Sequence, residues 1–179
     1  SAASDVYKRQ ETGYATIRSN AQNRYVPNFS YGKGKIVWNF ESVNMPAGTD
    51  GFLYLNGDTW HWNGAANGAG WIQIRIYPQD STTKSSFKLH YDWTAEEFTL
   101  EESMNDIKTI ELDTKVDPED ATKVNVTFSI NGKVYYSGKK HNAFDLDGHK
   151  GVIFYSGFSG PFSPECTIVF KSLDYEVYE

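Results

Sequence analysis

The chain has 179 residues, of which 39% are hydrophobic and 22% charged, and its formal net charge is -6 with a pI near 5.2. This length suits one domain that buries roughly 70% of its unfolded surface. The acidic balance argues against a nucleic-acid or anionic-membrane partner, and no apolar run is long enough to cross a bilayer.

The first ten residues, Ser1 to Gln10, show no hydrophobic period or apolar face and lack the long apolar core of a signal peptide. The stretch from Asp5 to Gln10 resembles translated adapter sequence from assembled environmental reads. We therefore expect residues 1–12 to be non-native or disordered and residues 13–179 to form a single domain. An export signal is then missing from this chain, and we expect a bacterial, extracellular or cell-surface protein.

The rest of the chain reads as about ten short strands separated by Gly, Pro and Asn turns. No strand-helix alternation occurs, so the pattern predicts an all-β fold with two antiparallel sheets packed as a sandwich. The expected strands cover residues 14–18, 35–41, 51–56, 71–77, 87–93, 107–113, 124–130, 133–137, 152–155 and 167–177.

Two of these strands, 71–77 and 87–93, alternate between an apolar and a polar face. The apolar face comprises Ile72, Ile74, Ile76, Phe87, Leu89 and Tyr91. The opposite face carries Trp71, Gln73, Arg75, Tyr77, Lys88, His90 and Asp92. It is denser in aromatic, amide, guanidinium and imidazole groups than solubility requires, so we interpret it as a binding face.

A sugar ring needs a flat aromatic partner for its C–H face and planar polar groups for its hydroxyls. We therefore predict a carbohydrate site formed by Trp60, Trp62, Trp71, Gln73, Arg75, Tyr77, His90 and Asp92. Alternatives are that Trp60 and Trp62 form a minor core and that the polar face is a buried network. A register with Arg75 opposite Lys88 would oppose like charges, so we expect Arg75 opposite His90 and Gln73 opposite Asp92.

The segment 124–134 predicts a hairpin, because apolar residues alternate up to Asn131-Gly132, which favours a type I′ turn. Before it, Asp117-Pro118-Glu119-Asp120 is typical of one capped helical turn. Residues 94–97 match a capping box, but Phe98 and Leu100 alternate as in a strand, and both alternatives stay open.

This one-turn bridge, alternating strand and Asn-Gly-Lys hairpin resembles the concanavalin A-like and laminin G-like jelly rolls, as does the terminal strand 167–177. The resemblance implies that the terminal strand pairs near the N-terminal strand, and that a concave, aromatic-lined sheet holds carbohydrate. It supports the fold more than the function.

Retaining glucanases of this fold carry a Glu-x-Asp-x-x-Glu strand, which brings two carboxylates to about 5 to 5.5 Å. Glu111-Leu112-Asp113 begins this pattern, but Val116 stands where the closing Glu is needed. A lyase would need an Arg or amide and a His or Tyr base, which Gln73, Arg75, Tyr77 and His90 supply, and Gln-Ile-Arg is similar to an element of jelly-roll alginate lyases.

We assign no catalytic residue and no cofactor. The histidines His61, His141 and His149 lack metal-site spacing, and Asp145-Leu146-Asp147-Gly148 is interpreted as a plain turn, with a structural calcium ion as the weaker alternative. Cys166 is expected to be a buried thiol.

The predicted function is a non-catalytic, lectin-like domain that binds a polysaccharide or oligosaccharide. We expect a monomeric part of a larger protein with no nucleic-acid or membrane partner. The alternatives are a polysaccharide lyase or glycoside hydrolase, and a cell-surface domain that adheres to protein.

Overall fold

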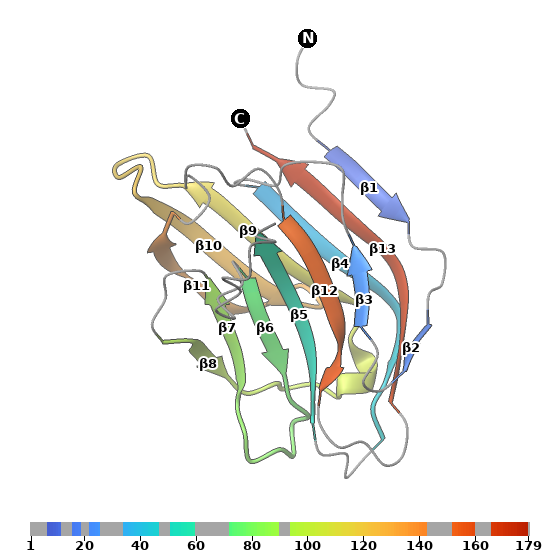
Figure 1. The fold of residues 1–179 in the computed structure, drawn as a ribbon. Coiled ribbons are helices and arrows are strands. Elements are labelled where there is room, and N and C mark those ends of the chain that lie inside the picture. Colours follow the sequence, from blue (N-terminus) through green and yellow to red (C-terminus); the bar gives the residue numbers. More distant parts are fainter. Residues whose placement is uncertain are drawn as a thin grey trace.

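The computed structural model describes residues 7–11, 16–18, 22–25, 34–46, 51–59, 72–89, 94–142, 152–159 and 166–178. These residues form two antiparallel sheets that lie one behind the other (Figure 1), together with one short 3-10 helix, η2 (Met104–Asp106). The predicted all-β sandwich is confirmed.

The sheet at the back of Figure 1 has seven strands. Its order is β1 (Tyr7–Glu11), β13 (Thr167–Val177), β4 (Gly34–Asn44), β9 (Thr109–Val116), β10 (Lys123–Ile130) and β11 (Lys133–His141), and β2 (Thr16–Arg18) also pairs with β13. The last strand therefore returns to pair with the N-terminal strands β1 and β2, as expected.

The front sheet has six strands in the order β3 (Gln22–Tyr25), β12 (Val152–Ser159), β5 (Phe52–Thr59), β6 (Ile72–Ile76), β7 (Ser85–Leu89) and β8 (Glu96–Phe98). The segment 94–97, for which helix and strand were both open, thus leads into a strand. Part of the segment 1–12, which we expected to be non-native or disordered, forms β1 and pairs with β13. The predicted domain boundary at residue 13 stays a prediction.

Alternation along the strands builds the core between the sheets. In β4, Ile36, Trp38 and Phe40 point inward and are almost completely buried. Phe87 of the front sheet stacks on Phe128 of the back sheet, with ring centroids 5.4 Å apart and planes 7° apart. Aromatic burial across the two layers therefore stabilises the sandwich. Cys166 is fully buried and belongs to no disulfide, as predicted.

The β10–β11 hairpin turns as the sequence predicts, because Asn131 and Gly132 have φ angles of 49° and 78°. Asn131 also ties the turn to β9, since its Oδ1 accepts hydrogen bonds from the backbone N–H groups of Lys108 (2.7 Å) and Thr109 (3.0 Å). Asn131 thereby connects the turn between β10 and β11 to the start of β9.

The expected helical turn at residues 117–120 is wrong. Asp117 Oδ1 accepts a hydrogen bond from the Glu119 N–H at 3.0 Å, which closes an Asx turn, and the chain then runs through a second turn into Lys123. The Asp side chain caps a neighbouring N–H, as expected of it, but the connection between β9 and β10 is too short to add a helix.

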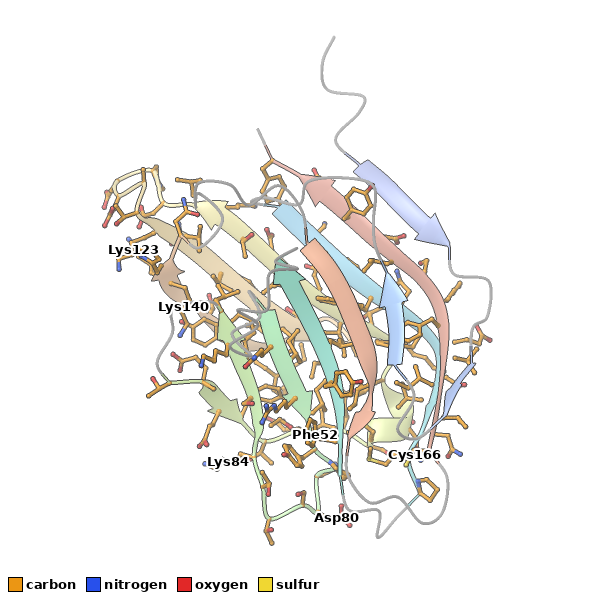
Figure 2. The ribbon with its side chains drawn as sticks, in the orientation of Figure 1. Phe52, Asp80, Lys84, Lys123, Lys140 and Cys166 are labelled. Atoms are coloured by element: carbon orange, nitrogen blue, oxygen red, sulfur yellow. The ribbon has the colours of Figure 1, made fainter. Side chains whose placement is uncertain are left out.

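One side of the sandwich is closed by an ion pair between the edge strands β8 and β11. Lys140 Nζ lies 2.6 Å from Glu96 Oε1 and 5.1 Å from the centre of the Tyr136 ring. Lys140 is only 8% exposed, and Figure 2 labels it at this edge. The pair joins the two sheets where no backbone hydrogen bond links them.

Candidate functional site

The predicted binding face lies on the front sheet and points away from the core where its side chains are described. Ile74 and Ile76 are fully buried, whereas Arg75 between them is exposed and Gln73 is half-buried. Tyr77, directly after β6, is also half-buried. The predicted orientation of these residues is confirmed. The predicted site residues Trp60, Trp62, Trp71, His90 and Asp92 lie outside the described residues and stay predictions.

The expected register between β6 and β7 is wrong. Arg75 pairs with Ser86 and Gln73 with Lys88, so β7 is shifted by four residues from the predicted pairing of Arg75 with His90. The even shift keeps every side chain on its predicted face. The buried hydroxyl of Ser85 accepts the Tyr77 N–H at 2.9 Å and anchors this register.

Three aromatic side chains gather around Arg75 on this face. The ring centroid of Phe52 lies 4.9 Å from that of Tyr77 and 6.4 Å from that of Tyr54. The guanidinium carbon of Arg75 stands 5.4 Å from the centre of the Phe52 ring. Figure 2 shows Phe52 near one end of β5. We call Phe52, Tyr54, Arg75 and Tyr77 the aromatic cluster.

Sequence reasoning did not identify Phe52 and Tyr54 as site residues. They alternate with Leu53 and Leu55, which are fully buried in the core, so this pattern already indicates that the two aromatic residues face outward. Tyr54 is only 8% exposed although it lies outside the core cluster. It pairs directly with Arg75, which places the cluster on two adjacent strands.

The register aligns positions of neighbouring strands in rows that cross the sheet. One row runs through Gly157, Tyr54, Arg75, Ser86 and Glu97. The next runs through Arg24, Tyr155, Asn56, Gln73 and Lys88. With strands ~4.8 Å apart, five positions span about 19 Å. An elongated ligand lying across the strands would meet a series of such positions.

Charge on this face is mainly positive where side chains are described. Arg75 and Lys88 supply two cations, and Glu97 of β8 supplies a carboxylate. Arg75 and Gln73 sit on one strand with the same orientation, and Ser86 and Lys88 face them from the next strand. Together these residues offer a guanidinium, an ammonium, an amide and a hydroxyl beside aromatic rings.

The partial hydrolase motif lies on the other sheet. Glu111 and Asp113 belong to β9, on the side of the back sheet away from the buried Leu112. Asp113 Oδ1 accepts a hydrogen bond from the Tyr178 hydroxyl at 2.8 Å, and burial together with this carboxylate raises the pKa of Tyr178. These acidic residues are therefore separate from the aromatic cluster.

A polar depression of about 660 Å³ lies elsewhere, at the β9–β10 connection and β11. Its lining includes Asp117, which is ion-paired with Lys139, and Lys140, which is ion-paired with Glu96. The hydrogen bond from Lys139 holds the pKa of Asp117 below its ordinary value. Much of the charge that lines this depression is therefore already neutralised by ion pairs within the protein.

In the part of the chain that the structure describes, no group of three His, Cys, Asp or Glu side chains could hold a metal ion. The turn that the sequence predicts at residues 145–148 lies outside that part. No helix among the described residues is long and apolar enough to cross a membrane.

No protein-family model matches the chain, and no curated protein matches it. Several solved structures do match the chain. The Emp46p carbohydrate recognition domain, in its potassium-bound form, is 12% identical with a TM-score of 0.61, over 97% of this chain and 89% of that one.

A GH16 protein of the Bacteroides ovatus mixed-linkage glucan locus, solved with a G4G4G3G product, is 9% identical with a TM-score of 0.61 and covers 95% and 94% of the two chains. A legume lectin-like domain from Entamoeba histolytica is 12% identical with a TM-score of 0.55, over 97% and 91%. At these identities the likeness establishes architecture alone. The chain therefore has the concanavalin A-like jelly-roll fold that its hairpin and terminal strand predict.

Proposed function

We propose that this chain is a non-catalytic carbohydrate-binding domain that holds a polysaccharide on the outer face of the six-stranded sheet. The observation that carries the proposal is the aromatic cluster beside Gln73 and Lys88. These residues lie on the outer face of strands whose inward-facing residues form the core. An extracellular or cell-surface setting, where polysaccharides are encountered, goes with it.

The chemistry of this face matches that of a sugar. A pyranose presents C–H groups that pack on an aromatic ring and hydroxyls that need oriented donors and acceptors. Tyr77 is half-buried, so part of its ring is open to a ligand while Phe52 supports it from one side. Gln73 provides an amide and Arg75 a fork of N–H donors at the next outward positions of the same strand.

The structural neighbours support carbohydrate as the ligand class. One is described as a carbohydrate recognition domain and another was solved with an oligosaccharide product. They represent binding and hydrolysis on the same architecture, so they do not favour either.

The carboxylates described on this face favour binding over hydrolysis, because they do not form the pair that a glycosidase needs. A retaining glycosidase places two carboxylates about 5 to 5.5 Å apart at its site. Among the side chains described on β6, β7 and β8, the outward-facing carboxylate is Glu97, while its neighbour Glu96 is bound to Lys140. A lyase is the alternative that Gln73, Arg75 and Tyr77 support, since they include an amide, a cation and a phenol.

Affinity gels with neutral and uronic polysaccharides, combined with product assays on the same panel, test the proposal. The protein should be retarded by at least one polysaccharide without cleaving it. Tyr77→Ala should weaken that binding by about 5-fold to 150-fold, by analogy with the ~1 to 3 kcal/mol of stacking on aromatic side chains.

Val134→Ala is the matched control, because Val134 is 53% exposed on β11 of the other sheet. It should leave retardation unchanged. Failure of every polysaccharide to bind would reject the function, and equal effects of the two substitutions would reject the location.

A further inference from the structure

The arrangement of cations on the binding face indicates which saccharides it prefers. Resting on the function proposed above, we propose that the face selects an anionic saccharide, whose carboxylate or sulfate group is held between Arg75 and Lys88. The shared chemistry is a planar or tetrahedral oxyanion carried on a sugar ring.

The register brings the two cations to one anion. Arg75 pairs with Ser86 and Gln73 with Lys88, so Arg75 and Lys88 are diagonal neighbours across β6 and β7. Diagonal positions lie about 7 to 8 Å apart, which both long side chains bridge when they converge on one oxyanion. Ser86 and Gln73 occupy the other two corners of this arrangement, so a hydroxyl and an amide border the same area.

Arg75 and Lys88 have no carboxylate partner among the described residues, unlike three lysines of β11. Lys133, Lys139 and Lys140 each form an ion pair with an acidic side chain. Within the described part of the chain, Arg75 contacts the Phe52 ring and forms no ion pair, and the Lys88 side chain makes neither an ion pair nor a hydrogen bond. Two unneutralised cations therefore share one surface of a protein whose net charge is -6.

Desolvation decides what such a surface binds. A neutral sugar that covers Arg75 and Lys88 would strip water from two charges and return no opposite charge, which is unfavourable. An anionic group offsets this cost with charge-assisted hydrogen bonds, which are roughly twice as strong as neutral ones. Glu97, two strands from Arg75 in the same row, forms no ion pair with either cation and limits how far the anion-selective area extends.

Phe52 positions the guanidinium for this role. The guanidinium carbon of Arg75 lies over the Phe52 ring, and Phe52 is itself packed against Tyr77. A guanidinium that rests on a ring face keeps the N–H groups of its edge available, and these form two parallel hydrogen bonds with a carboxylate or sulfate. Less side-chain entropy is then lost when the anion binds.

The test compares ligands that differ only in charge. Calorimetric titrations would use oligogalacturonate and the same oligomer with its carboxyl groups reduced to alcohols, and dextran sulfate beside dextran. Each ligand is titrated into the native protein and into Arg75→Gln, Lys88→Gln and Lys171→Gln. Lys171 is an exposed lysine of β13 in the other sheet, so its substitution removes the same charge away from the face.

We expect an anionic oligomer to bind about tenfold or more tightly than its neutral counterpart, which corresponds to ~1.4 kcal/mol. Arg75→Gln should weaken binding of the anionic oligomer much more than binding of the neutral oligomer, and so remove most of this preference, whereas Lys88→Gln should remove a smaller part. Lys171→Gln should behave as the native protein. A preference for galacturonate identifies carboxylate, and one for dextran sulfate identifies sulfate.

Equal affinity for charged and neutral oligomers overturns this inference and leaves the proposed carbohydrate-binding function standing. A preference that Lys171→Gln reduces as much as Arg75→Gln also overturns it, since net charge alone would then explain the result. If neither these ligands nor the polysaccharide panel bind, both the inference and the proposed function fail.

Discussion

Two phenylalanines, Phe128 of the back sheet and Phe52 of the front sheet, provide a direct comparison of core and site. Phe128 lies between the sheets, fully buried, and contacts the rings of Phe87 at 5.4 Å and Phe98 at 5.6 Å. Phe52 lies on the outer face, half-buried, beneath Arg75. We predict that the same substitution, Phe→Ala, affects stability at the first position and binding at the second.

The expected magnitudes follow from burial. Phe128→Ala opens a cavity where two ring contacts were made, and such deletions cost about 3 to 5 kcal/mol. This is a large fraction of the about 5 to 15 kcal/mol that stabilises a typical domain. Phe52 buries roughly half as much apolar surface, and its deletion leaves no enclosed cavity, so Phe52→Ala should cost about 1 to 2 kcal/mol.

Urea denaturation followed by tryptophan fluorescence measures both values. With a slope of about 2 kcal/mol per M, the midpoint should fall by about 2 M for Phe128→Ala and by about 0.5 to 1 M for Phe52→Ala. Folded Phe52→Ala should bind polysaccharide more weakly, because Arg75 and Tyr77 lose their support. A stability loss for Phe52→Ala as large as that for Phe128→Ala would refute the division between core and binding face.

Three further predictions concern the turn, acid stability and catalysis. Asn131→Ala should cost about 2 to 4 kcal/mol in urea melts, because it strains a φ of 49° and deletes hydrogen bonds to two N–H groups, whereas Asn131→Gly should cost about 1 kcal/mol less because glycine accepts that φ. Because the pKa of Asp117 in the folded protein lies below its ordinary value of 3.8, this carboxylate contributes stability above about pH 4 that is lost as the pH falls through the lowered pKa. Asp117→Asn should therefore flatten the acid side of the stability profile, and an unchanged acid side would contradict the assignment. The purified protein should release no reducing ends from β-glucans or xylans; release that Glu111→Gln abolishes would show that β9 is catalytic, and unsaturated products absorbing in the ultraviolet would favour a lyase.

Local patterns predicted much of the sandwich. The alternation of Ile74 and Ile76 with Gln73 and Arg75 was sufficient to orient β6, because a strand with one buried face has a period of two. The Asn131-Gly132 turn was predictable for a similar reason, since its positive φ angles have few alternative sequences.

Features that depend on distant residues were not predictable in the same way. The β6–β7 register was judged from charges on the outer face, while the buried hydroxyl of Ser85 that anchors it lies on the inner side. The Lys140–Glu96 ion pair joins residues far apart in sequence. Phe52 and Tyr54 were overlooked because aromatic residues are common in strands, and only the pairing of β5 with β6 brings them to Arg75.

The central claim, that the outer face of the six-stranded sheet binds carbohydrate, is tested most directly by one titration. The tightest-binding polysaccharide of the panel is titrated into the native protein and into Arg75→Ala/Tyr77→Ala, whose cooperative thermal melting first shows that it is folded. Loss of a stacking ring and a charged donor should weaken binding by about 20-fold or more. An unchanged Kd in the folded double variant would contradict the claim and place the ligand elsewhere on the protein.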